Sequence, residues 1–163
     1  MTPEASQTDF LDKARRAAVA GMLAAALAMV LGSFLDWISI VRLPKVLPES
    51  ELQRAGAVTG TEAGDGWWVV ILAAVLINAA LLLWMKRKSF WGWVGFITSI
   101  VVGSIGIADY RAIARSGSPF LQQLDVVGEI DHGIGILLVL AGGLLGVIFS
   151  LVGVAASPYT SQD

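Results

Sequence analysis

Residues 66–85 read GWWVVILAAVLINAALLLWM, and none of these twenty side chains is acidic, basic or a histidine. At a rise of about 1.5 Å per residue, a helix of this length spans about 30 Å, the thickness of the hydrocarbon core of a bilayer. Three other stretches have the same character: 17–35, 89–108 and 133–156. The sequence therefore predicts an all-α membrane protein with four transmembrane helices.

The composition favours a single transmembrane domain over residues 1–163. Charged residues make up only 15% of the chain, whereas soluble domains average about 25%. The four spans occupy about half of the chain, which leaves too little for a separate soluble domain. A net charge of −2 argues against a nucleic-acid partner, and the lack of cysteine excludes disulfides and thiol chemistry. No cofactor motif occurs, so we expect no cofactor.

Basic clusters predict the orientation, because lysine and arginine in short loops resist translocation. One cluster lies at residues 13–16, before the first span, and the sequence Lys-Arg-Lys fills the turn at 86–88. Both clusters fall on the same side of the membrane, which we assign to the cytoplasm of a bacterium. We therefore expect a multi-pass plasma-membrane protein with both termini cytoplasmic and the loops 36–65 and 109–132 outside.

Every tryptophan and tyrosine falls near a predicted membrane boundary, where such amphipathic rings are favoured. This agreement supports the span limits. The outer edge has Trp37, Trp67, Trp68 and Tyr110, and the inner edge has Trp84, Trp91, Trp93 and Tyr159.

Small residues recur at every fourth position in three of the spans and should allow close helix packing. Packing within the bundle is one interpretation, and contact between one row and another protein is the alternative. The rows are Ala20, Ala24, Ala28 and Gly32; Gly95, Ser99 and Gly103; and Gly142, Gly146 and Ser150.

Asn78 is the only amide side chain within a span. It lies near the predicted depth of Thr98 and Ser99, so we expect a hydrogen bond between the second and third spans. A contact between Asn78 and a bound ligand is the alternative hypothesis.

The two halves of the chain share a pattern that predicts an internal duplication. Each half has Gly-Ser near the end of a span, followed by an aspartate and an aromatic residue, in Asp36-Trp37 and Asp109-Tyr110. Each half then has a glutamate and an aspartate before the glycine that opens the next span. The halves would form a parallel 2+2 pseudo-repeat about an axis along the membrane normal.

The aspartates at the span ends have different expected roles. Asp65 and Asp131 precede spans that start outside, so each is predicted to cap a helix N-terminus. Asp36 and Asp109 lie where spans end, near the negative end of the helix dipole. For these two residues the hypotheses are a solvated headgroup position, a local salt bridge, and a site that binds a partner or ligand.

His132 is the only histidine, and Glu129 and Asp131 are close to it in sequence. With Glu62 or Asp65, these side chains form a candidate set for a divalent metal, since imidazole and carboxylate groups are common ligands. A solvated residue in the first turn of span four is the alternative. We predict no metal site and keep His132 as an interaction candidate.

The outer loops are predicted to contain short surface helices at 49–55 and 118–124, of which the second starts with Ser-Pro. Residues 57–66 are expected to form a flexible loop. Neither loop is long enough to form a domain.

Two local motifs, Asp36-Trp37 at the first exit and Asp65-Gly66-Trp67-Trp68 at the start of the second span, accompany the short Ala/Gly/Val-rich spans. In outline the chain resembles small four-span plasma-membrane proteins of actinobacteria. Most of these have no assigned function, and some small four-span proteins act as accessory subunits of larger envelope complexes. The resemblance implies the four-span fold and assigns no functional residue.

The functional hypotheses depend on which kinds of functional residue the sequence lacks. No span contains an ionisable residue of the kind that marks an ion path. The leading hypothesis is a non-catalytic accessory or scaffold subunit that contacts a larger envelope complex or a second copy of itself. The alternatives are a small-solute or lipid transporter with a cavity between the two halves, and a metal-dependent enzyme built around His132.

Overall fold

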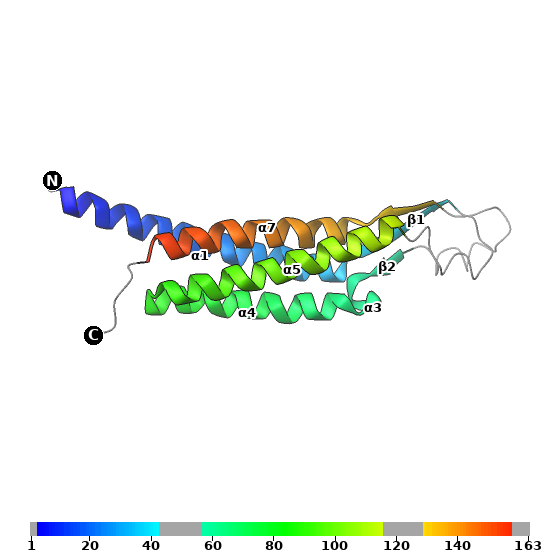
Figure 1. The fold of residues 1–163 in the computed structure, drawn as a ribbon, viewed down its shortest axis with the longest axis horizontal. Coiled ribbons are helices and arrows are strands. Elements are labelled where there is room, and N and C mark those ends of the chain that lie inside the picture. The colour runs from blue at the N-terminus through cyan, green and yellow to red at the C-terminus, as the bar shows by residue number, and fades with distance from the viewer. Residues whose placement is uncertain (1–2, 43–56, 116–128, 158–163) are drawn as a thin grey trace.

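The computed structural model describes residues 3–42, 57–115 and 129–157 of the chain. Each of the four long helices is long and apolar enough to cross a membrane. The expected all-α fold with four transmembrane helices is therefore confirmed. The helices alternate in direction along one elongated bundle (Figure 1): α1 (Pro3–Phe34), α4 (Asp65–Lys86), α5 (Ser89–Arg115) and α7 (Ile134–Ala155).

Two helices extend past the predicted span limits. α5 continues to Arg115 rather than ending at Ala108, because residues 109–115 contain no glycine or proline that would stop it. α1 begins at Pro3, well before the apolar segment, and proline is favoured in the first turn of a helix. The segment at 109–115, predicted as loop, is thus helical.

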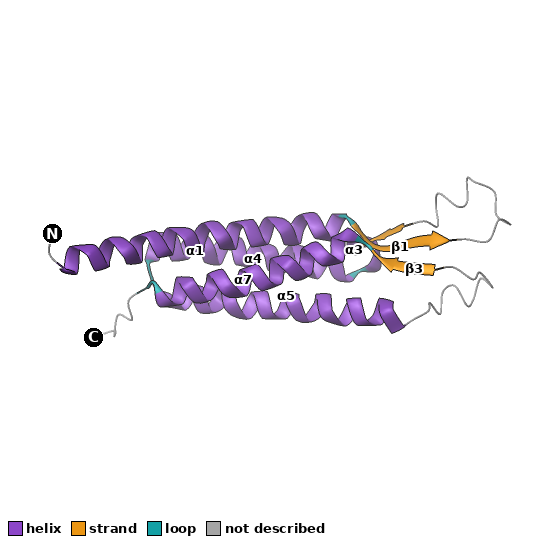
Figure 2. Ribbon diagram, turned by 90° about the horizontal axis from the view of Figure 1, so that it is seen from above, coloured by secondary structure: helices purple, strands orange, loops and turns teal. Residues whose placement is uncertain are grey.

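A small sheet lies at the end of the bundle opposite the turn at 86–88 (Figure 2). Strand β1 (Asp36–Arg42) is central and pairs antiparallel with β2 (Ala57–Thr59) and with β3 (Glu129–His132). The sequence of β1, DWISIVR, is rich in β-branched and aromatic residues, which favour strands. We call this end of the bundle the sheet end and the opposite end the basic end.

The predicted outer loops therefore contain regular structure. Residues 57–66, expected to be a flexible loop, form β2, the short helix α3 (Gly60–Ala63) and the start of α4. The surface helices predicted at 49–55 and 118–124 lie outside the described residues.

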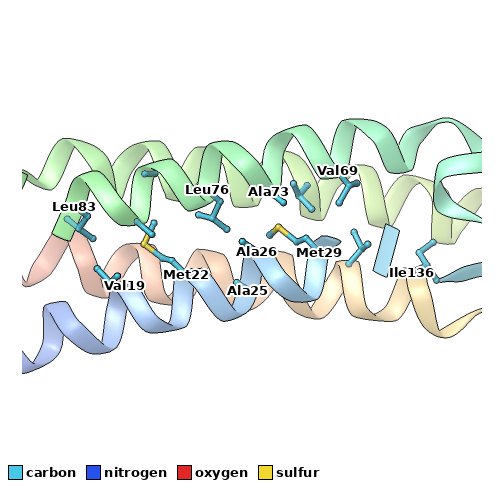
Figure 3. Close-up of a cluster of buried hydrophobic side chains, with 14 of the residues drawn as sticks. Val19, Met22, Ala25, Ala26, Met29, Val69, Ala73, Leu76, Leu83 and Ile136 are labelled. Carbon is cyan, nitrogen blue, oxygen red and sulfur yellow. The ribbon is translucent and has the colours of Figure 1, made fainter. Parts of the chain in front are cut away.

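The core runs between the helices along the length of the bundle. α7 packs mainly against α1 and α5, and α4 packs against the same two helices, so α4 and α7 lie across a diagonal. Met22 and Met29 of α1 are fully buried with Leu76 and Leu83 of α4 (Figure 3). The flexible methionine side chains are suited to filling the irregular space between helices.

Rows of small residues let α5 approach α7 closely. A Cβ added to Gly95 would lie 2.7 Å from Ser150 Oγ, and one added to Gly143 would lie 3.1 Å from Gly103 Cα. Lipid tails provide no hydrophobic force between helices, so such close packing is a main source of their association. The predicted packing of the rows in the third and fourth spans within the bundle is therefore confirmed.

The row of small residues predicted in α1 is mostly not packed against another helix, unlike the rows of α5 and α7. Ala20 and Ala24 are exposed, and only Gly32 of this row is fully buried. A Cβ on Gly32 would lie 2.6 Å from the carbonyl oxygen of Gly135 in α7. Most of this row thus faces away from the other helices.

Candidate functional site

The side chain of Trp37 is buried at the sheet end of the bundle. Trp37 is only 1% exposed, and its Nε1–H donates a 2.9 Å hydrogen bond to the carbonyl oxygen of Gly32. The backbones of Gly60 and Gly135 lie against the indole, and a Cβ on Gly135 would be 2.8 Å from Trp37 Cδ1. Glycines of α3 and α7 thus make room for the ring inside the protein, and the predicted place of Trp37 at the level of the membrane interface stays a prediction.

Gly133 joins the strands to the start of α7. Its N–H donates a 2.9 Å hydrogen bond to the carbonyl oxygen of Trp37, and a Cβ at this position would collide with the carbonyl group of Asp36. Gly133 is also the N-cap of α7, so the predicted cap by Asp131 is wrong. Asp131 instead lies in β3, in register with Ser39 of β1.

The predicted cap by Asp65 is also wrong. Asp65 is the first residue of α4, and the N-cap is Gly64, whose φ of 98° is readily adopted only by glycine. The capping box in this region belongs to α3, where the N–H of Thr59 donates a 3.0 Å hydrogen bond to the carboxylate of Glu62. The Thr-x-x-Glu pattern at 59–62 is a sequence signal that could have located it.

The capping box also controls the charge of Glu62. Hydrogen bonds from the backbone N–H and the hydroxyl of Thr59 stabilise the ionised carboxylate and lower the pKa of Glu62 below its usual 4.5. Glu62 is therefore held by its own helix end rather than directed towards His132.

Asp65 and Asp109 meet where α4 begins and α5 passes it. Their carboxyl groups lie within hydrogen-bonding reach of each other, and Oδ2 of Asp109 is buried with no hydrogen-bond partner among the described residues. Two carboxylates this close repel each other, and burial adds to the cost of their charge. Sequence reasoning missed this contact because it ended the third span before Asp109.

Asp36 and Asp109, which the predicted duplication makes equivalent, lie in different kinds of element. Asp36 begins β1 and is exposed, whereas Asp109 is a partly buried residue within α5. No hydrogen bond between them occurs in the described part of the chain. The duplication itself stays a prediction.

His132 is held by an aromatic neighbour. Its ring stacks on that of Tyr110 with a centroid separation of 3.9 Å and an interplanar angle of 20°. Its Nε2 lies 3.2 Å from the carbonyl oxygen of Tyr110. Among the side chains that the structure describes, no three histidine, aspartate or glutamate groups gather as a metal would require; the side chains of Glu129 and Asp131, which belong to the predicted set, lie outside them. The contacts of His132 therefore join β3 to α5.

Thr98 and Ser99, two polar residues of α5, bond to their own helix. The Thr98 hydroxyl donates to the carbonyl of Val94, and the Ser99 hydroxyl donates to that of Gly95, each at 2.8 Å. The predicted hydrogen bond between Asn78 and these residues is therefore wrong, because each hydroxyl is satisfied one turn back along α5.

Asn78 lies on an exposed surface of α4. Its Nδ2 donates a 2.8 Å hydrogen bond to the carbonyl of Ala74. No described residue donates a hydrogen bond to its side-chain oxygen. Asn78 is seven residues from Met85, which places it about 10 Å along the helix from the end of the apolar segment. An amide oxygen without a donor at this depth is costly in lipid.

Comparisons of the chain with protein-family models, with curated proteins and with solved structures give no significant match. The class of protein therefore follows from the fold: a helical membrane protein with four candidate spans and a small sheet at one end.

Proposed function

We propose that this protein is a non-catalytic accessory or scaffold subunit of the bacterial plasma membrane, which binds another transmembrane helix through α4. The observation that carries the proposal is Asn78, whose amide faces outward within the span and whose oxygen receives no hydrogen bond from the described residues. A neighbouring helix that supplies a donor would satisfy this oxygen, and such contacts hold membrane helices together.

The surface around Asn78 suits a helix partner. Four exposed residues share one row with Asn78, in which each member is three or four residues from the next: Ile71 and Ala74 precede it, and Leu81 and Met85 follow it. Residues at these spacings lie on one face of a helix. Ala74, one turn from Asn78, is small enough to let a second backbone come close to the amide. This face of α4 would thus let a partner helix come close and would offer it one polar contact, the Asn78 amide.

The interior of the bundle supports a structural role over transport. The small residues of α5 and α7 bring their backbones together, and buried hydroxyls of Ser33, Thr98 and Ser99 bond to their own helices. Ser150 of α7 has a buried hydroxyl without a hydrogen-bond partner among the described residues, but it is isolated from other such groups. The described parts of the spans therefore offer no continuous chain of polar groups through the core that a solute could follow.

A small-solute or lipid transporter, with a cavity between the two halves, is the alternative proposal. It gains support only from the buried Oδ2 of Asp109, which lacks a hydrogen-bond partner among the described residues. In that case a variant with alanine at both Asp36 and Asp109 would lose transport while keeping its fold.

Mild detergent extraction followed by native mass spectrometry tests the accessory role. We expect the full chain to be released with a partner or a second copy, and Asn78→Leu to weaken that association about threefold, as a cross-helix hydrogen bond of about 0.6 kcal/mol implies. Ser104→Ala is the matched control, because Ser104 is also exposed within a span and bonds to Ile100. A wild-type chain that is released alone, or an Asn78→Leu variant that associates as well as the wild type, would count against the proposal.

A further inference from the structure

Six basic residues lie at the basic end of the bundle, but among the described residues only two acidic side chains pair with them. Asp9 pairs with Lys13 at 2.8 Å, and Asp12 pairs with Arg15 at 2.7 Å. No ion pair involving Arg16 or the turn at 86–88 occurs within the described residues. This end therefore carries several positive charges that the described protein does not neutralise.

These charges lie at one level of the bundle. A Cβ on Gly153 would be 2.7 Å from Leu83 Cδ2 and 3.6 Å from Ala18 Cβ, so α1, α4 and α7 meet there. Arg15 lies one turn beyond Ala18 towards the basic end, and the N–H of Arg87 bonds back to the carbonyl of Leu83. The segment of α1 and the turn between α4 and α5 therefore lie at the same end of the bundle (Figure 1).

Arg15 is the most informative of these residues. Its side chain is 7% exposed, and beyond its bond to Asp12 the Nε group is buried without an acceptor in the described part of the chain. A buried N–H donor on a charged group carries a high cost unless an acceptor reaches it. Besides the Asp12 carboxylate, the guanidinium of Arg15 thus has room for one further acceptor that the described residues do not provide.

The start of α5 adds to the positive field. The positive end of the α5 dipole follows directly after Lys88, and the first turn of α5 contains no acidic residue. Exposed apolar side chains border this turn on both sides, with Trp84 50% and Phe90 61% exposed. Cations next to exposed aromatic rings match the boundary between headgroups and acyl chains.

We infer that the basic end binds the phosphate of an anionic phospholipid headgroup, held between Arg15 and the turn at 86–88. The guanidinium of Arg15 supplies fixed donors, and Arg87 and Lys88 supply charge at the headgroup level. The exposed Trp84 and Phe90 would lie against the acyl chains of the same lipid. A soluble phosphate would use the same cations but would gain nothing from these rings. The inference rests on membrane insertion and is independent of the proposed partner of α4.

Substitution of Arg87 can test this site without disturbing the fold. It is the only non-glycine residue in the described chain with a positive φ, at 55°. Glycine adopts that conformation without the steric penalty of a Cβ. Arg87→Gly therefore removes a charge without straining the turn, so a loss of binding would not result from unfolding.

The experiment uses the full chain in mild detergent with equal amounts of phosphatidylglycerol and phosphatidylcholine of identical acyl chains. Native mass spectrometry measures the ratio of retained lipids. We expect the wild type to prefer phosphatidylglycerol, and Arg87→Gly and Lys88→Gln each to lower that preference about fivefold. Arg111→Gln, which removes an exposed charge at the sheet end, should leave the ratio unchanged.

Two results would overturn the inference: equal retention of both lipids by the wild type, or displacement of phosphatidylglycerol by millimolar inorganic phosphate, which would identify a soluble anion as the ligand. Asn78→Leu separates this site from the proposed function, since it should weaken partner binding and leave the lipid ratio unchanged. Arg15→Gln should lower the preference as well, and its circular dichroism spectrum shows whether it remains folded.

Discussion

At the scale of single residues, Trp37 shows how one side chain can organise an end of the bundle. The sequence placed this residue near the membrane boundary, and its position at the end of the first apolar segment is as expected. Its burial was not predictable, because the space for the ring is made by Gly60 and Gly135, which are distant in sequence. The indole therefore connects α1, α3 and α7 through packing that no local pattern encodes.

We expect Trp37→Phe to lower the free energy of unfolding by about 1–3 kcal/mol, because the Gly32 carbonyl loses the one side-chain donor that the described residues give it. Thermal unfolding in detergent, followed by circular dichroism, measures the change. Trp68→Phe is the control, since Trp68 is 61% exposed and should change stability little. Equal effects of the two substitutions would show that Trp37 does not hold the sheet end.

At the scale of elements, the contact between α5 and α7 could be predicted from the sequence, whereas the caps of α4 and α7 could not. Small residues at every fourth position identified the packing faces of both helices. The caps of α4 and α7 are glycines, so a search for acidic capping side chains led to Asp65 and Asp131 instead. Backbone conformation at a glycine leaves no side-chain signal of that kind.

Gly146→Ala tests the α5–α7 contact. A Cβ at Gly146 would run into the side chain of Ser99, so we expect a loss of about 1–3 kcal/mol of stability from overpacking. Gly103→Ala is a matched control on the facing helix, because nothing lies within 4 Å of a Cβ built there. That substitution should be neutral or should stabilise α5 by up to about 1 kcal/mol through helix propensity. Thermal unfolding of both variants in the same detergent measures the change in stability. A larger loss of stability from Gly103→Ala than from Gly146→Ala would contradict the packing described.

The capping box of α3 should respond to pH. Because the pKa of Glu62 is lower in the folded protein than its usual 4.5, ionised Glu62 stabilises α3 above that value. This contribution is lost as the pH falls below 4.5 through the folded-state pKa. Hydrogen exchange at the N–H of Thr59, the donor to Glu62, should therefore become less protected in acid after correction for the intrinsic rate. Glu62→Gln should remove this pH dependence, and an unchanged profile in the wild type would contradict it.

At the scale of the whole molecule, the sequence predicted the bundle and missed the sheet for the same physical reason. An uncharged run long enough to cross a bilayer is a local signal, so the four spans could be found one by one. The sheet pairs residues 36–42 with 57–59 and with 129–132, which are separated by long segments of chain. Such non-local pairing leaves no periodicity within any one segment. The extension of α5 past Ala108 was missed because only apolar residues were counted as span.

The orientation of the molecule is the remaining whole-chain prediction, and the lack of cysteine makes it directly testable. Lys88→Cys places one thiol in the turn at the basic end, and Ala63→Cys places one at an exposed position of α3 at the sheet end. Because basic residues in short loops stay on the cytoplasmic side, a membrane-impermeant maleimide should label Ala63→Cys in intact cells. Lys88→Cys should react only after the membrane is permeabilised. The reverse pattern would place the basic end outside, so the positive charges at 86–88 would not have set the topology.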